Sequence, residues 1–151
     1  MPKITVVDTS TLILFDKLGM LMLLEKLFGK IHITSTVAKE FNKPLPGWVE
    51  VHNPNTDLPQ ELTTSLDIGE ASIISLASGY TDCLLIIDEL KGRSIARKLG
   101  IRLTGALGIL ITAKKKKIIP EVRPILEQIQ ATNFRISESL VKTVLRSAGE
   151  L

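Results

Sequence analysis

The sequence predicts an α/β protein in which a central parallel sheet lies between two layers of helices, a three-layer α/β/α sandwich. Short apolar, β-branched runs alternate along the chain with longer segments whose apolar residues recur at helical spacing. This alternation is typical of right-handed βαβ units, which build parallel sheets covered on both faces. The chain has 151 residues and neither an internal repeat nor a long linker, so we expect one domain over residues 1–151.

In the first half of the chain, glycines and hydroxyl residues mark where the elements begin and end. The runs ITVV and IHI are expected strands, because both are apolar and too short for helices. Gly19 and Gly29 end two helices, and the hydroxyl residues 34–36 offer caps for a third. The expected elements are strands over 4–7 and 31–33, helices over 10–18 and 20–28, a helix that carries Glu40, and a short extended piece over 48–52. Four of the seven prolines fall between residues 44 and 65, which we interpret as an irregular surface excursion.

The second half alternates between strands and helices more regularly. Gly79 and Gly100 end two of the expected helices, and a proline opens the first turn of another. The lysines at the end of 105–116 suit the negative end of a helix dipole. The expected elements are strands over 84–87 and 101–103 and helices over 67–78, 90–99, 105–116, from Pro120 or Pro124 to about 132, and 137–147.

Composition indicates a soluble protein of a reducing compartment. Hydrophobic residues make up 44% of the chain and charged residues 23%, as in ordinary globular domains. The single cysteine, Cys83, excludes an intrachain disulfide, and we expect it to be a small buried apolar residue. No apolar stretch approaches the roughly 20 residues of a membrane helix, and the start lacks the apolar run of a signal peptide. We therefore expect a cytoplasmic protein with no membrane partner, and the net charge of +3 permits a nucleic-acid partner.

Four acidic residues follow strands or lie on the helices that come after them. ITVV runs into Asp8 and CLLII runs into Asp88, while Glu40 and Glu70 lie on helices. The carboxyl ends of parallel strands meet at one edge of the sheet, where ligands of such proteins bind. Gathered carboxylates resist ionisation, and a cation that prefers hard oxygen ligands relieves their repulsion. The sequence therefore predicts a Mg²⁺ or Mn²⁺ site, and the absence of neighbouring histidine or cysteine disfavours zinc there.

Each of these acids also has a purely structural interpretation. Either Asp8 or Ser10 can cap the first helix, and Asp88 can cap the helix that follows it. Glu70 stands three residues after an aspartate, which is the spacing of a capping box. Glu40 can be a solvated charge between two lysines. The functional hypothesis rests on the four acids together, since any one of them is explained without it.

Other polar residues near the acids allow two interpretations each. Ser10 can bond a ligand carboxylate or a metal-bound water, or cap a helix. Lys91 and Arg93 can hold substrate phosphates, or form a solvated helix face. Glu89 is interpreted as a first-turn charge favoured by the helix dipole. We interpret the run 114–117, four lysines, as a solvated helix end rather than a nucleic-acid track.

Several remaining residues are interpreted as structural. His32 and His52 are isolated in the sequence and are expected to be ordinary surface or core histidines. Thr104 is expected to cap the helix that follows it. Trp48 is expected to pack in its loop, although an exposed aromatic ring can stack on a base.

At the acidic residues the chain resembles the PIN-domain nucleases, most closely the small prokaryotic branch related to the VapC-type toxins. VVDTSTLILFDKLG resembles the first PIN motif, in which a strand delivers an aspartate followed by a small hydroxyl residue. STVAKEF resembles the second, LDIGEASIISLA the third and LLIIDELKGRSIARKLGI the fourth. LTGALGILITAKKKKIIPEV and SESLVKTVLRSAGEL resemble the continuation and the end of this branch, so the similarity covers nearly the whole chain.

The resemblance implies a PIN-like sandwich, Mg²⁺ or Mn²⁺ held by Asp8, Glu40, Glu70 and Asp88, and hydrolysis of RNA phosphodiester bonds. Asp8 and Asp88 would be the direct ligands, with Glu40 and Glu70 ligating through water or acting as general base. VapC toxins also form homodimers and pair with an antitoxin protein, so these are expected partners. Two departures matter: Glu70 is longer than the aspartate usual in VapC toxins, and Thr104-Gly105 stands where some PIN proteins place another acid.

Two other functions stay open at this stage. A catalytically inactive PIN-like module would bind nucleic acid or a protein partner, and metal binding without RNA cleavage would favour it. A phosphotransfer enzyme with an aspartyl nucleophile is the third hypothesis. Haloacid-dehalogenase-like phosphatases carry a second aspartate two residues after the first, whereas Ser10 stands at that position here.

Overall fold

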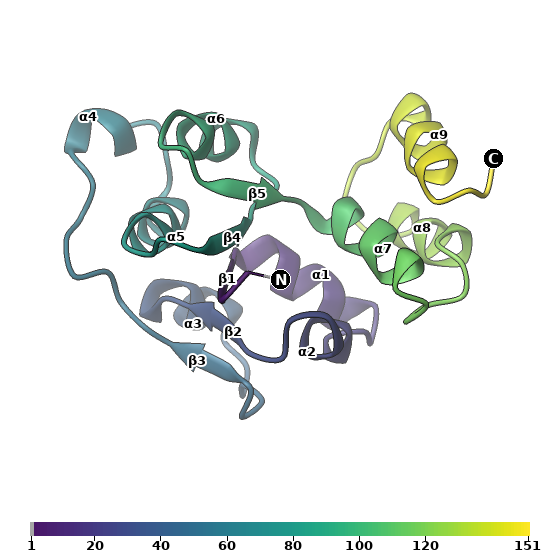
Figure 1. Cartoon of the computed structure of the whole chain (residues 1–151), viewed down its shortest axis with the longest axis horizontal. Helices are drawn as coiled ribbons and strands as arrows, with labels where there is room; N and C mark the ends of the chain where they lie inside the picture. Colours follow the sequence, from purple (N-terminus) through teal and green to yellow (C-terminus); the bar gives the residue numbers. More distant parts are fainter. Residues whose placement is uncertain (1) are drawn as a thin grey trace.

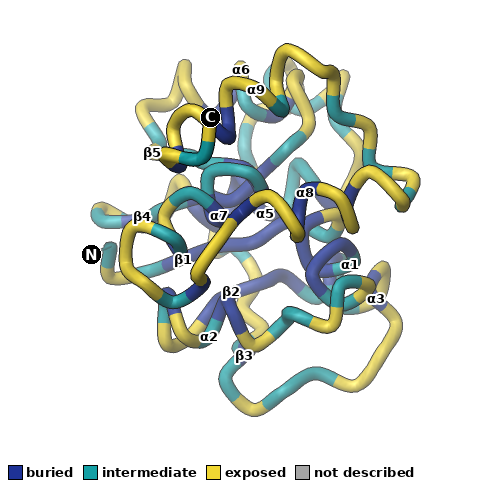
Figure 2. Tube along the Cα trace, turned by 90° about the vertical axis from the view of Figure 1, so that its right-hand side faces the viewer, coloured by how far each residue is buried: buried dark blue, intermediate teal, exposed yellow. Residues whose placement is uncertain are grey.

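A five-stranded, all-parallel sheet with the order β3-β2-β1-β4-β5 runs through the protein (Figure 1). The computed structural model describes residues 2–151. The strands are β1 (Ile4–Val7), β2 (Ile31–Ile33), β3 (Val49–Val51), β4 (Cys83–Ile86) and β5 (Arg102–Thr104). Strand β2 and most of β1 are buried, as expected for strands covered on both faces (Figure 2).

Helices cover both faces of this sheet. They are α1 (Thr9–Lys17), α2 (Met22–Phe28), α3 (Ser35–Phe41), α4 (Gln60–Thr63), α5 (Ile68–Ser78), α6 (Leu90–Lys98), α7 (Ala106–Lys115), α8 (Arg123–Gln130) and α9 (Glu138–Ser147). Helices α5 and α6 lie on one side of the sheet, and α1, α2 and α7 to α9 lie on the other (Figure 1). Helix α3 contacts both α1 and α5. The predicted three-layer α/β/α sandwich with a parallel sheet is therefore confirmed.

The chain reverses its direction across the sheet between β1 and β4. From β1 it proceeds through β2 to β3, and it then returns past β1 to form β4 and β5 on the other side. In open α/β sheets, ligands bind outside the carboxyl ends of the strands at such a reversal point. The pairing of Val7 with Ile86 brings the residues that leave β1 and β4 to the same edge.

The C-terminal helices are tied together by Glu150. Its carboxylate accepts hydrogen bonds from the backbone N–H groups of Val122 (2.7 Å) and Arg123 (3.0 Å) at the start of α8. It also pairs with the Lys114 ammonium group at 3.0 Å. Lys114, at the head of the four-lysine run, therefore stabilises the packing of α7 against the end of the chain.

Three local expectations need correction. Asp8, rather than Ser10, is the N-cap of α1, which begins at Thr9. The interpretation of Thr104 as a helix cap is wrong, because the N-cap of α7 is Gly105 and the first N–H of that helix bonds Asp88 instead. The stretch 44–65 is not wholly irregular, since it contains the short helix α4. The extended piece expected over 48–52 is confirmed as β3, which pairs in register with β2. In residues 2–151, no helix is long and apolar enough to cross a membrane.

Candidate functional site

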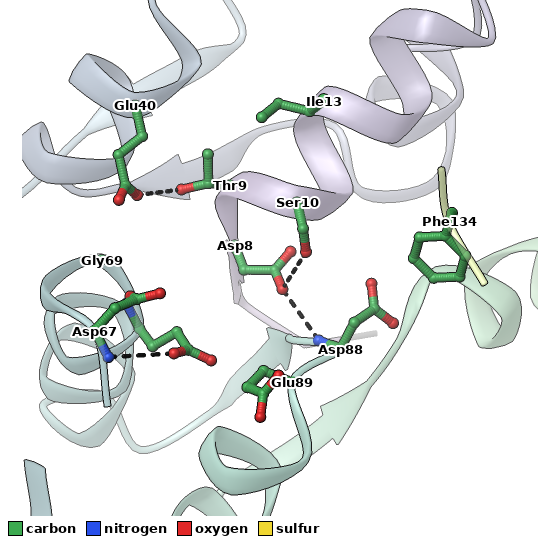
Figure 3. Close-up of a pocket in the computed structure, with 11 residues that line it drawn as sticks. Asp8, Thr9, Ser10, Ile13, Glu40, Asp67, Gly69, Asp88, Glu89 and Phe134 are labelled. Atoms are coloured by element: carbon green, nitrogen blue, oxygen red, sulfur yellow. Dashed lines mark hydrogen bonds between the residues drawn. The ribbon is translucent and has the colours of Figure 1, made fainter. Parts of the chain in front are cut away.

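A pocket of about 540 Å³ lies at the carboxyl edge of the sheet, outside the ends of β1 and β4 (Figure 3). All four of the acids singled out in the sequence line it: Asp8, Glu40, Glu70 and Asp88. They come from four segments that are far apart in the chain. The fold therefore brings them to one place.

Asp8 is held from three directions. It is 5% exposed, and its Oδ1 accepts a hydrogen bond from the backbone N–H of Thr11 at 2.9 Å, which caps α1. Its Oδ2 accepts from the hydroxyl of Ser10 at 3.1 Å and from the backbone N–H of Asp88 at 3.0 Å (Figure 3). The structural interpretation of Asp8 as a cap and its place in the acidic pocket thus hold together, and Ser10 bonds a pocket carboxylate.

Asp88 is fixed by groups from two other elements. Its Oδ1 accepts from the backbone N–H of Ala106 at 3.1 Å, and its Oδ2 accepts from the Thr11 hydroxyl at 3.2 Å. Thr11 therefore bonds Asp8 with its N–H and Asp88 with its hydroxyl. The expectation that Asp88 caps α6 is wrong, because Glu89 is the N-cap of that helix. The Asp88 carboxylate therefore makes no capping bond to α6, the helix that follows it.

Glu40 lies across the pocket on α3. Its Oε1 accepts a hydrogen bond from the Thr9 hydroxyl at 2.6 Å (Figure 3). The same oxygen lies against the backbone of Gly69, where an added Cβ would overlap it. A Cβ at Gly105 would likewise overlap the carboxylate of Asp88. Two glycines therefore let carboxylates approach helix starts more closely than any other residue would allow.

One carboxylate oxygen of Glu70 takes part in a helix cap, and the other has no hydrogen-bond partner among the described residues. Its backbone N–H bonds Asp67 Oδ1 at 2.7 Å, and its Oε1 accepts from the Asp67 N–H at 3.3 Å, so the capping box is confirmed. Its Oε2 is buried and has no hydrogen-bond partner among residues 2–151. A buried polar atom without a partner is unfavourable by about 1–3 kcal/mol. A cation, or water bound to one, would satisfy this oxygen.

The carboxyl groups of Asp8, Glu70 and Asp88 resist ionisation. Burial, and then the negative charge of Asp88, raises the pKa of Asp8 to about 6. Burial raises the pKa of Glu70 to about 7, and it also raises the pKa of Asp88. Carboxylates that line one pocket, with raised pKa values and one unsatisfied oxygen, fit Mg²⁺ or Mn²⁺, which take carboxylates together with water. Asp8, Asp88 and Glu70 are thus the residues best placed to hold such an ion.

The two basic residues expected to hold phosphates do not line the pocket. Lys91 is exposed on α6 and borders a separate depression beside Glu61. Arg93 donates a hydrogen bond from Nη1 to the carbonyl oxygen of Ile87 at 3.1 Å. Arg93 therefore holds the end of β4, next to Asp88, rather than facing the cavity.

Sequence reasoning missed three contributors to the site. Thr9 and Thr11 bond the acids, and their signal was the run of hydroxyl residues that follows Asp8. Phe134 lines the pocket from the connection between α8 and α9 (Figure 3). No local pattern identifies Phe134, because its position depends on how the C-terminal helices pack.

A parallel α/β/α sandwich with acids gathered at the reversal point of its sheet defines a class of α/β proteins whose ligand site lies at that edge. The family assignment is more specific. The family model DUF3368, a PIN domain, matches residues 4–150, so the chain belongs to this PIN-domain family. A search of curated proteins finds no match. The predicted PIN-like fold is thus confirmed, and PIN domains are generally metal-dependent nucleases.

Proposed function

We propose that the protein is a ribonuclease that hydrolyses RNA phosphodiester bonds in a Mg²⁺- or Mn²⁺-dependent reaction at the acidic pocket. The observation that carries this proposal is the buried, unpartnered Oε2 of Glu70 in the same pocket as Asp8 and Asp88, whose pKa values are raised. A pocket of fixed, reluctantly ionised carboxylates is unfavourable without a cation. Family membership supports the same conclusion.

Bound Mg²⁺ or Mn²⁺ would lower the pKa of an attacking water and neutralise charge on the phosphate. Asp8 and Asp88 would be the direct ligands, because the shared contact with Thr11 fixes both carboxylates. Glu70, with a pKa of about 7, is suited to accept a proton from water at Oε2 near neutral pH. Glu40 would hold water opposite them from its bond with Thr9.

The substrate side of the proposal rests on the rim of the pocket. Phe134 and Ile13 give the cavity apolar surface beside the acids. An aromatic ring at this position can stack on an unpaired base, which favours single-stranded RNA. Lys91 and Arg93 remain weaker candidates for phosphate contacts, since they lie outside the cavity. A VapC-like toxin role, a homodimer and an antitoxin partner rest on family resemblance alone.

The proposal is tested by cleavage of a mixed set of labelled single-stranded RNAs with Mn²⁺, with Mg²⁺ and with EDTA. We expect metal-dependent cleavage by the wild type and by the control Glu61→Gln, whose exposed acid lies outside the pocket. Asp8→Asn should lose it. Undiminished cleavage by Asp8→Asn would refute the site, and RNA binding without cleavage by the wild type would favour the inactive module.

A further inference from the structure

A second polar cluster lies away from the acidic pocket, on the edge of the sheet formed by β2 and β3. His32 of β2 pairs in register with Glu50 of β3, so the two side chains project from the same face. His52 follows Glu50 by two residues, and its N–H continues the ladder by bonding the carbonyl oxygen of Ile33 at 2.8 Å. Strand alternation therefore puts all three side chains on one face.

The three side chains converge. One ring nitrogen of each histidine and one carboxylate oxygen of Glu50 all lie within 4.8 Å of one another. The two rings are 5.1 Å apart and tilted by 35°, and His52 Nε2 lies 2.9 Å from Glu50 Oε1. The other oxygen of Glu50 pairs with Lys30 at 3.0 Å. None of these residues borders the acidic pocket.

His32 has an unsatisfied nitrogen. The residue is only 9% exposed, and within the described part of the chain its Nδ1 is buried without a hydrogen-bond partner. A neutral imidazole has one donor and one acceptor nitrogen, so a buried ring needs partners for both. Neither Lys30 nor His52 bonds this nitrogen, and both bond Glu50 instead. The cluster therefore lacks a partner for His32 Nδ1.

We propose that His32, Glu50 and His52 bind a zinc ion at the β2–β3 edge, separate from the acidic pocket and independent of its activity. Two imidazole nitrogens and one carboxylate oxygen are a donor set that zinc uses when a fourth position is left for water. Mg²⁺ and Mn²⁺ prefer oxygen alone, so the two sites select different metals. Zinc–ligand distances of about 2.0–2.2 Å in a tetrahedral site place the donors about 3.3–3.6 Å apart. The half-exposed His52 and Glu50 side chains would close this gap by rotating.

The bound zinc would link β3 to β2 at the edge of the sheet. Strand β3 is three residues long, and few backbone bonds hold it. The segment after His52 borders a cavity of about 590 Å³ that also includes Tyr80, whose ring lies 6.4 Å from that of His32. A metal bound by both strands would hold β3 and the start of this segment in place.

The first experiment uses nitrogen-15-labelled protein without a polyhistidine tag. The chain contains only two histidines, so every imidazole signal in the spectrum reports on this cluster. One equivalent of Zn²⁺ should shift the signals of both rings. The signals of the zinc-free protein should then disappear. Histidine signals that do not move at saturating Zn²⁺ would overturn the proposal.

The variants separate this site from the acidic one. In a calorimetric titration, His52→Ala should bind Zn²⁺ more than about 100-fold more weakly than the wild type. Mutating a residue that only supports a metal ligand already lowers metal affinity by about 10–100-fold, and His52 would be a ligand itself. Asp8→Asn should bind Zn²⁺ like the wild type. Lys30→Met should bind Zn²⁺ at least as tightly, because the competing cation on Glu50 is gone. Equal Zn²⁺ affinity in wild type and His52→Ala would refute the ligand set, whatever the result of the RNA cleavage test.

Discussion

The acidic pocket and the His32–Glu50–His52 cluster use the same sheet in different ways. The pocket gathers residues that leave the strands, and backbone N–H groups and hydroxyls hold two of its carboxylates from several directions. The cluster gathers residues from within two paired strands and leaves His52 and Glu50 partly exposed. Its donors are mixed nitrogen and oxygen, whereas the pocket offers oxygen only. One fold can therefore present two sites with opposite metal preferences.

The largest expected effect concerns the pocket. Asp8→Asn should lower RNA cleavage by about 1000-fold or more, because a lost metal ligand removes several kcal/mol of transition-state stabilisation. Single-turnover rates in Mn²⁺ measure this directly. Zn²⁺ binding by the same variant should be unchanged. A parallel loss of Zn²⁺ binding would mean that the two sites are not separate.

The reciprocal prediction concerns the cluster. His52→Ala should cleave RNA at the wild-type rate in Mn²⁺, since His52 lies outside the pocket. It should lose the rise in melting temperature that Zn²⁺ gives the wild type, which corresponds to about 2.7 kcal/mol at 100-fold excess over Kd. Thermal melting with and without Zn²⁺ provides the measurement. If RNA cleavage fell with zinc binding, the two regions would be coupled.

A smaller effect tests how the pocket is packed. Gly69→Ala should lower cleavage by about tenfold, because the new Cβ displaces the Glu40 carboxylate and small misplacements weaken catalysis. Gly47→Ala is the matched control, since a Cβ there meets nothing within 4 Å. Zn²⁺ affinity should not change in either variant. Equal cleavage by both would show that Glu40 has no role.

The smallest effect is a dependence on pH. The pKa values of Asp8, about 6, and Glu70, about 7, lie above the ordinary values of 3.8 and 4.5. The stability these groups give the metal-free fold is therefore fully present below about pH 4 and is lost as pH rises through 6 to 7. Mn²⁺ binds the ionised carboxylates, so it should raise the melting temperature by a few degrees more at pH 8 than at pH 5.5. A larger rise at pH 5.5 would contradict the assignment.

The position of the acidic pocket was largely predictable because it follows from the order and direction of the strands. Asp8 and Asp88 follow apolar runs, and parallel strands must deliver such residues to one edge. The capping-box spacing of Glu70 was also correct, since it is local. The cap of α7 was not predictable from Thr104, because the first N–H of that helix, on Ala106, bonds Asp88 in the loop after β4.

The histidine cluster was hidden for a physical reason. Strand β3 is short and lies in a proline-rich stretch, so its pairing with β2 depends on tertiary contacts rather than local pattern. Without that register, His32 and His52 are twenty residues apart and unrelated. The alternation of Glu50 and His52 was a weak signal for a shared face. Phe134 was hidden in the same way by helix packing.

The dual use of Asp8 and Glu70 has a consequence for how this family evolves. Asp8 caps α1 and Glu70 completes the capping box of α5, and both also line the pocket, so selection for folding alone would preserve both. A descendant that stopped cleaving RNA would keep these two acids while Glu40, which is exposed on α3 and caps no helix, drifted more freely. Among related genes, the residue at position 40 should therefore record lost catalysis sooner than the residues at positions 8 and 70.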